Sequence, residues 1–327
     1  MCVNISTISS PYPYAGGKSR VAAECWQKFG DVGNYIEPFF GSGAMLLARP
    51  KFHGNETVND ADCYIANLWR AIRIAPDTVA EYADQPVNEC DLHANHTWLL
   101  GCAEFRERMV TEPDYFDPVI AGKWLCYIAQ WIGGGWCSNN YYWDNRTENM
   151  PIHASSPSRQ LPHLGNNGQG AHAAKRQSNL YPLMQQFQER FRHVRVCCGD
   201  WSRVMGPSVT TGHGMTAIFF DPPYSAEAGR NNDLYAVESA TVAHDVREWC
   251  AANGSNPLLR IALCGYDTEH GELDSLGWTR HAWKTTGGYG GQGDGATAGK
   301  TNKHREVIWF SPACIAEHQQ RLGIGAM

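Results

Sequence analysis

The feature that most constrains the fold of this chain is a repeated alternation of short apolar runs with helical patterns. Each run is short enough for a buried strand and ends in a turn or an acid, and helical apolar spacing follows. This alternation predicts a parallel α/β sheet. We expect strands at 35–37, 57–59, 194–198, 217–220 and 258–264, and helices at 18–29, 44–48, 62–74 and 238–251.

Two later segments, 278–284 and 306–310, alternate or run apolar on either side of a Gly-rich stretch at 287–299. They predict a closing pair of strands with a long connection.

The central segment 76–192 breaks the alternation. Helical patterns at 98–110 and 116–131 precede a long tract rich in Asn, Ser, Gly, His and Pro. Such a tract is unusual inside a compact domain. We therefore expect an inserted second domain at 76–192, with 1–75 and 193–327 forming the sheet domain.

Length and composition indicate a globular protein. The 327 residues, 43% of them hydrophobic, suffice for one large domain or two ordinary ones. No run of about 18 apolar residues, the length of a membrane-spanning helix, occurs. The segment Met1 to Ser10 lacks the basic start and apolar run of a secretory signal. We expect a cytoplasmic protein.

The cysteines and histidines do not indicate a metal site or a disulfide framework. The 12 cysteines include the adjacent pair Cys197-Cys198 but no C-x-x-C. The 13 histidines include no H-x-x-x-H or H-E-x-x-H pairing. Cys197 and Cys264 lie in apolar runs, where cysteine acts as a small hydrophobe. We expect no bound metal.

The net charge of −6 is unevenly distributed. Segment 151–196 carries six Lys or Arg residues against one acid, and 280–305 carries five against one, which gives +5 and +4 and leaves −15 elsewhere. Basic patches of this kind can meet nucleic-acid phosphates, although solvated loops explain them equally well.

The sharpest chemical motif is Asp221-Pro222-Pro223-Tyr224, directly after the predicted strand 217–220. Open α/β sheets bind ligands at the carboxyl ends of their strands. Two prolines fix the backbone and remove two N–H donors, so carbonyls there can grip an amine. Asp221 and the Pro222 carbonyl can accept both hydrogens of an aryl amine such as that of adenine, while Tyr224 stacks on the ring. A rigid turn is the alternative.

A Gly-containing loop, Glu37-Pro38-Phe39-Phe40-Gly41-Ser42-Gly43, follows the first predicted strand. Gly41 and Gly43 allow a tight turn and close approach of the backbone to a ligand. Glu37 can pair with a positively charged amino group, such as that of S-adenosylmethionine. Asp60 ends the next strand, where an acid commonly accepts hydrogen bonds from ribose hydroxyls.

Two further motifs complete the predicted ligand site. The segment Tyr14-Ala15-Gly16-Gly17-Lys18-Ser19 resembles a phosphate-binding loop, but Tyr12 stands where that pattern needs its first glycine. The N-terminus of the helix that follows favours a carboxylate, such as that of the methionine tail. Asp200 and Trp201 follow strand 194–198, and could accept from an adenine amino group and pack on its ring. A helix cap before a core tryptophan is the alternative.

Together these motifs resemble those of the Dam-like, alpha-class DNA N6-adenine methyltransferases of bacteria and phages. The resemblance covers most of the chain. It implies a Rossmann-like, S-adenosylmethionine-dependent methyltransferase sheet of seven strands, the last antiparallel, with an inserted and mostly helical target-recognition domain. It also implies that Tyr14, Lys18, Asp60 and Asp221 contact the cofactor. The predicted cofactor-binding residues are Tyr14, Gly17, Lys18, Glu37, Phe39, Gly41, Gly43, Asp60, Asp200, Trp201 and Asp221, and the predicted catalytic residues are Asp221, Pro222, Pro223 and Tyr224.

The resemblance places sequence specificity in the inserted domain, with double-stranded DNA as the partner. Aromatic side chains can wedge into a base stack and arginine can read guanine edges. The candidate DNA-binding residues are Trp136, Tyr141, Arg146, Lys175 and Arg176. Core packing is an equal alternative for Trp136. The tract 151–179 has no counterpart in the family pattern, so the recognition sequence cannot be transferred.

We therefore predict site-specific methyl transfer to the N6 amino group of an adenine flipped out of the duplex. Catalysis would rest on positioning and electrostatics, without a covalent enzyme intermediate. Cytosine C5 methylation is set aside because the chain has no Pro-Cys dipeptide. The alternatives are methylation of cytosine N4, RNA adenine or protein glutamine, nucleotide binding through Gly16-Gly17-Lys18, and DNA binding without catalysis.

Overall fold

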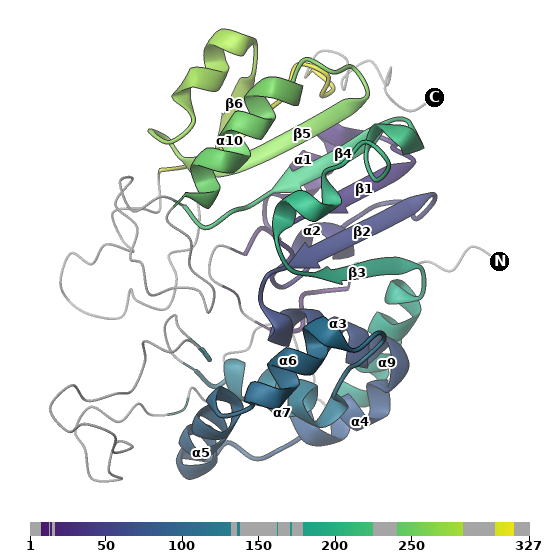
Figure 1. The fold of residues 1–327 in the computed structure, drawn as a ribbon, viewed down its shortest axis with the longest axis vertical. Helices are drawn as coiled ribbons and strands as arrows, with labels where there is room; N and C mark the ends of the chain where they lie inside the picture. Colours follow the sequence, from purple (N-terminus) through teal and green to yellow (C-terminus); the bar gives the residue numbers. More distant parts are fainter. Residues whose placement is uncertain are drawn as a thin grey trace, which may run out of the picture.

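A seven-stranded sheet forms the centre of the computed structural model, which describes residues 8–12, 14, 17–131, 136–137, 162, 171, 179–224, 241–283 and 305–316. The strand order is β3-β2-β1-β4-β5-β7-β6 (Figure 1). The strands are β1 (Asn34–Glu37), β2 (Asn55–Asp60), β3 (Val194–Cys198), β4 (Thr216–Phe220), β5 (Leu259–Tyr266), β6 (Thr279–Ala282) and β7 (Glu306–Phe310).

Strand β7 runs antiparallel to both of its neighbours, β5 and β6, while β1 to β5 pair in parallel. This confirms the strands predicted from the sequence and the expected sheet of seven with an antiparallel last strand. Because β7 lies between β5 and β6 and runs the opposite way, its first residue, Glu306, lies opposite Tyr266 at the end of β5. The last strand thus begins at the edge of the sheet where the parallel strands end.

Each face of the sheet has its own hydrophobic core, because successive strand residues point to opposite faces. Tyr35 and Phe219 belong to one core, and their neighbours Ile36 and Phe220 belong to the other. Helices α1 (Ala22–Phe29), α2 (Ala44–Leu47) and α3 (Cys63–Ile74) contribute to the first core, and η1 (Trp201–Val204) and α10 (Val242–Asn253) to the second. Helical elements therefore cover both faces, as in Rossmann-like folds.

Helix α3 shows how local sequence sets these elements. Asp62 caps it by accepting a hydrogen bond from the Tyr64 backbone N–H at 2.8 Å. Ile65, Leu68 and Ile72 follow at helical spacing and are buried. The predicted helix at 18–29, by contrast, begins only at Ala22 after a turn.

In the described part of the segment between α3 and β3 there are five helices: α4 (Pro76–Ala83), α5 (Glu89–Leu100), α6 (Ala103–Thr111), α7 (Pro118–Ile128) and α9 (Leu180–Phe191). The single helix expected at 98–110 is wrong, because Gly101 and Cys102 separate α5 from α6. Sequence patterns also missed α4 and α9. Pro76, which was taken as a boundary, occupies the first helical position of α4, where its missing N–H costs nothing.

These helices lie beyond the β3 edge of the sheet (Figure 1), and α3 packs against both α7 and α9. Their buried residues form one continuous core with the first face of the sheet. A buried ion-pair cluster adds to this junction: both terminal nitrogens of Arg190 contact the Glu56 carboxylate of β2, at 2.6 and 2.8 Å. Arg49 donates to the same carboxylate at 2.9 Å. The division into two domains stays a prediction.

Candidate active site

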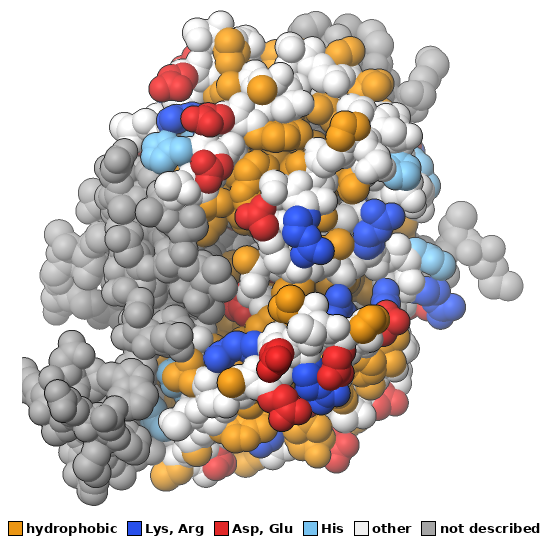
Figure 2. Space-filling model, viewed as in Figure 1, with side chains coloured by type: hydrophobic (Ala, Val, Ile, Leu, Met, Phe, Trp, Pro, Cys, Tyr) orange, Lys and Arg blue, Asp and Glu red, His pale blue; other side chains and the backbone are white. Residues whose placement is uncertain are grey.

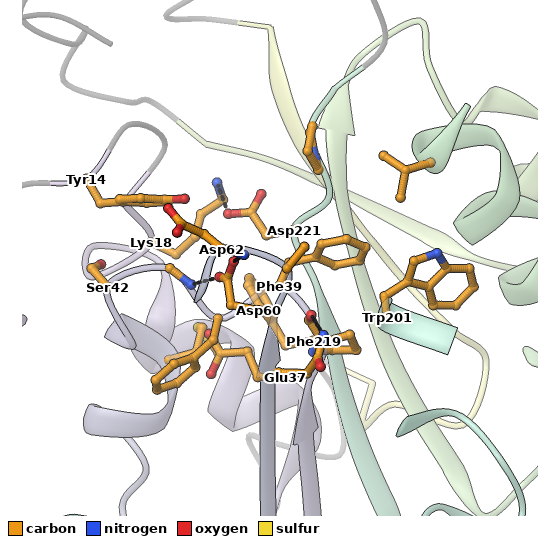
Figure 3. A pocket seen from close by; sticks show the side chains of 18 of the residues that line it. Tyr14, Lys18, Glu37, Phe39, Ser42, Asp60, Asp62, Trp201, Phe219 and Asp221 are labelled. Atoms are coloured by element: carbon orange, nitrogen blue, oxygen red, sulfur yellow. Dashed lines mark hydrogen bonds and ion pairs between the residues drawn. The ribbon is translucent and has the colours of Figure 1, made fainter. Parts of the chain in front are cut away.

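A cavity at the carboxyl ends of the parallel strands brings most of the predicted site residues together (Figure 3). Gly43, Pro222 and Tyr224 lie beside its lining rather than in it. The predicted residues that line the cavity are Tyr14, Gly17, Lys18, Glu37, Phe39, Gly41, Asp60, Asp200, Trp201, Asp221 and Pro223.

Sequence patterns missed part of the lining. Asp62 lies two residues after the predicted Asp60, and its position near a strand end was a signal that could have found it. Val242 and Asp245 enter the cavity from the start of α10, and no local motif marks them. The missed lining residues include Ser42, Asn59, Asp62, Phe219, Val242 and Asp245.

The Gly loop after β1 is held by Asp60 at the end of β2. The Gly41 N–H donates to Asp60 Oδ2 at 2.9 Å, and the Asp62 N–H donates to Asp60 Oδ1 at 2.9 Å. Gly41 has a φ of 48°, and a Cβ atom there would lie 2.6 Å from Cε1 of Tyr14. Only glycine therefore fits between this loop and the Tyr14 ring.

Buried carboxyl groups dominate the electrostatics of the cavity. Burial raises the pKa of Asp60 to about 6 and, with the nearby charge of Asp60, that of Asp62 to about 7. Burial also raises the pKa of Glu37, although the Tyr35 hydroxyl donates to Glu37 Oε2 at 2.8 Å and opposes the shift. Negative charge in this cavity is thus poorly compensated. A ligand with hydroxyl donors or a positive charge would stabilise it.

One end of the cavity is aromatic. The rings of Phe39 and Trp201 stack with their centroids 6.3 Å apart, and Trp201 meets the edge of Phe220 at 5.9 Å. Asp200 caps η1 by accepting from the Ser202 N–H at 2.9 Å, which confirms the cap interpretation of this residue. A carboxylate has about four acceptor positions, so the cap leaves capacity for a ligand amine.

Lys18 and Asp221 form an ion pair at the opposite side of the cavity. The Lys18 Nζ lies 2.8 Å from Asp221 Oδ2 and 3.9 Å from Glu306 Oε2. Burial lowers the pKa of Lys18, but Asp221 and Glu306 together outweigh burial, and the net pKa is raised. Lys18 therefore stays positively charged although its side chain is almost fully buried.

The candidate DNA-binding residues are placed only in part. Tyr141, Arg146, Lys175 and Arg176 lie outside the described residues, as does the Gly-rich stretch 287–299. Trp136 is 7% exposed and packs against the rings of His96 and Trp131, with centroids 5.1 and 5.2 Å away. This arrangement favours the core-packing alternative for Trp136.

The described part of the chain contains no cluster of three or more His, Cys, Asp or Glu side chains arranged to hold a metal ion. None of its described helices combines the length and the apolar character needed to cross a membrane.

Part of the chain matches the model of a known enzyme family. Residues 14–96 match the model of the family described as D12 class N6 adenine-specific DNA methyltransferase. By sequence, this part of the chain is similar to that enzyme family. No curated protein matches the chain.

The D12 class match confirms the resemblance predicted from the motifs. It extends from Tyr14 past the Gly loop and Asp60 into α5. Asp200 and the Asp221 to Tyr224 motif lie beyond it, so their roles rest on their geometry. The printed description of the matched family names adenine N6, which is one of the amino groups that the sequence left open. An origin in bacteria or phages stays a prediction.

Proposed function

We propose that this protein transfers a methyl group from S-adenosylmethionine to the N6 amino group of a flipped-out adenine in double-stranded DNA. One observation supports this most directly. Asp221, at the end of β4, lines the same cavity as Glu37, Asp60 and Trp201, which have the chemistry to hold the cofactor. An acceptor for an amine thus adjoins a cofactor-binding wall. The match of residues 14–96 to the D12 class supports the N6 amino group of adenine as the target.

The cavity residues fit the polar groups of S-adenosylmethionine. Glu37, whose negative charge is destabilised by burial, would gain from the cofactor's ammonium group. Asp60 and Asp62 would accept from ribose hydroxyls. Phe39 and Trp201 supply an apolar wall for the adenine ring, with Asp200 as an acceptor for its amino group.

We propose that Lys18 does more than pair with the carboxylate of the cofactor's methionine tail. Its ammonium already pairs with Asp221, so it belongs to the amine-binding side of the site. We place Lys18 next to the reacting amine, where it holds the Asp221 carboxylate in position.

The chain's own residues would activate the target amine by accepting its hydrogens. Asp221 and the Pro222 carbonyl are the proposed acceptors, which favours a pyramidal nitrogen with an available lone pair. Tyr224 would stack on the base. When bound, S-adenosylmethionine would supply an electrophilic methyl group, with its thioether as the leaving group. Asp221 would accept the proton that the methylated amine gives up.

A basic patch near the β3 edge supports DNA as the substrate. Arg70, Arg195 and Arg203 all lie close enough to the Cys197 thiol to oppose the rise in pKa that burial causes. Lys and Arg side chains gather on this face over β3 and the adjacent elements (Figure 2). The patch would contact phosphates. Helices of the 76–192 segment, placed beside it, would supply target recognition.

The test is methylation of unmethylated genomic DNA by the purified protein, followed by digestion to nucleosides and mass analysis. N6-methyladenine is the expected product. Detection of N4-methylcytosine would show that the target base is cytosine and not adenine. Absence of cofactor binding in calorimetry would favour a DNA-binding protein without catalysis.

Asp221→Ala separates catalysis from cofactor binding. It should lower methyl transfer by roughly 100-fold or more, in the range of a lost acid–base group, while the cofactor still binds. Asp31→Ala is the matched control, because Asp31 pairs with the exposed Lys51 away from the cavity. Near-normal transfer by Asp221→Ala would contradict the mechanism.

A further inference from the structure

Glu306, the first residue of β7, is a largely buried carboxylate that the proposed reaction does not use. Its side chain is 12% exposed, and its Oε2 lies 3.9 Å from the Lys18 Nζ. Among the described residues, Oε2 has no hydrogen-bond partner. Burying an ionisable group without a close hydrogen-bond donor costs stability, so such a group calls for an explanation. A function in the site is one such explanation.

Two carboxylates thus share one ammonium at the edge of the site. Lys18 is 2.8 Å from Asp221 and 3.9 Å from Glu306. If both carboxylates are ionised, the cluster carries one excess negative charge. A pair of Lys18 and Asp221 alone would be neutral, and Asp221 would then attract a partly positive amine more weakly.

Aromatic rings keep the ammonium between the carboxylates. The Lys18 Nζ lies 5.6 Å from the centroid of Tyr224 and 5.8 Å from that of Trp283. The backbone N–H of Trp283 donates to the Glu306 carbonyl at 3.3 Å, so β7 holds the backbone from which this ring projects. The ammonium is therefore held from several sides.

We infer that Glu306 is a positioning residue. It attracts the Lys18 ammonium in competition with Asp221, so that the negative charge of Asp221 is only partly neutralised and can accept the hydrogens of the target amine. The inference rests on the proposed function. As the methyl group arrives, positive charge develops on the amine nitrogen, and the excess negative charge of the cluster stabilises it. Preorganised charge of this kind is a large term in catalysis.

The charged and titratable groups around Glu306 agree with this role. Burial raises the pKa of Glu306, the Lys18 charge opposes the rise and Asp221 adds to it. Burial also raises the pKa of the nearby Cys264 thiol, which therefore stays neutral. Arg305, the preceding residue, is paired with Asp267 at 3.1 Å.

The test compares Glu306→Gln with the wild-type protein in activity and in stability. The kcat for DNA methylation should fall about tenfold, which corresponds to roughly 1.4 kcal/mol of lost transition-state stabilisation. The Kd for S-adenosylmethionine should not change, because Glu306 does not line the cofactor cavity. The rise of kcat with pH that reflects ionisation of Glu306 should disappear, and Glu306→Asp should restore part of the rate.

Stability provides a readout that needs no cofactor. An acid whose pKa is raised by folding destabilises the folded state above that pKa, and the effect vanishes below the unfolded value. Glu306→Gln should therefore raise the Tm by roughly 2 °C at pH 8 and leave it unchanged near pH 4. If Glu306 had a purely structural role, the Glu306→Gln substitution would lower the Tm instead.

Asp267→Asn is the matched control, since Asp267 lies at the same edge of the sheet but pairs with Arg305. It should change neither kcat nor its pH dependence. Unchanged kcat in Glu306→Gln, with an active wild-type protein, would overturn the inference and leave the proposed function standing. A wild-type protein that transfers no methyl group would overturn both.

Discussion

The hydroxyl of Tyr224 donates a hydrogen bond to Oδ1 of Asp221, with 3.2 Å between the two oxygens. The other oxygen of Asp221 pairs with Lys18. The side chain proposed to stack on the base is thus tied to the proposed acceptor of the base's amino group. For an amine to reach Oδ1, this hydrogen bond has to be shared or exchanged. Tyr224 therefore has two separable parts, a ring and a hydroxyl.

Substitution of Tyr224 should separate these parts. Tyr224→Phe keeps the ring, so methyl transfer should stay within a few-fold of the wild type. Tyr224→Ala removes stacking worth about 1–3 kcal/mol, so kcat/KM should fall roughly 5- to 150-fold. Steady-state methylation of DNA measures both. A Phe variant as impaired as the Ala variant would show that the hydroxyl is the essential part.

Gly41 should be intolerant of any side chain. A methyl group there would lie 2.6 Å from Tyr14, and the φ of 48° adds a strain of about 1–2 kcal/mol. Gly41→Ala should weaken S-adenosylmethionine binding by roughly tenfold or more, as measured by calorimetry. Gly33→Ala is the control, since the space around its Cβ is open to 4 Å. Equal affinities in the two variants would contradict the proposed fit of the Gly loop.

Stabilisation by the cofactor should depend on pH. The pKa values of Asp60 and Asp62 are raised to about 6 and about 7, so the ligand-free fold loses stability as pH rises through this range. A ligand whose hydroxyls donate to the ionised carboxylates restores it. The Tm increase caused by S-adenosylmethionine should therefore be larger at pH 8 than at pH 5.5. Asp62→Asn should reduce this difference; a larger increase at acidic pH would contradict it.

The Arg190 and Glu56 pair should make a large contribution to stability. Without Arg190, the buried Glu56 carboxylate keeps only Arg49 as its partner and loses two charge-assisted hydrogen bonds, so Arg190→Met should lower the free energy of unfolding by about 1.5–3 kcal/mol. Arg190→Lys should rescue little, since lysine lacks the planar fork that contacts both Glu56 oxygens. Urea unfolding measures both.

The exposed pair of Arg192 and Glu189 provides the control, since both side chains are more than half exposed. Arg192→Met should change the free energy of unfolding by less than about 1 kcal/mol. A similar loss in Arg190→Met and Arg192→Met would show that the buried cluster contributes no more than a surface pair.

The sheet and most of the cofactor wall were predictable because their signals are local. Apolar runs mark the strands, and residues at the ends of parallel strands meet at one edge, so Glu37, Asp60 and Asp221 could be placed together. Glu306 could not. It meets Lys18 only because β7 runs antiparallel between β5 and β6, and the two residues lie near opposite ends of the sequence.

Helix boundaries in the 76–192 segment were the weaker part of the prediction. A proline can start a helix or end one, and the structure shows the first case at Pro76. A tryptophan suits a core and a DNA interface equally well, and the burial of Trp136 depends on packing against α5. Such choices depend on tertiary contacts that spacing along the chain does not reveal.

The insertion of β7 between β5 and β6 has a consequence for biosynthesis. A ribosome makes β5 and β6 first, and until β7 emerges no strand joins β6 to β5. The Lys18 ammonium likewise lacks its second carboxylate until Glu306 has been made. A nascent chain that stops short of Glu306 therefore lacks both the strand that joins β6 to β5 and the second carboxylate of the charge cluster. We expect the protein to gain its activity only late in its own synthesis.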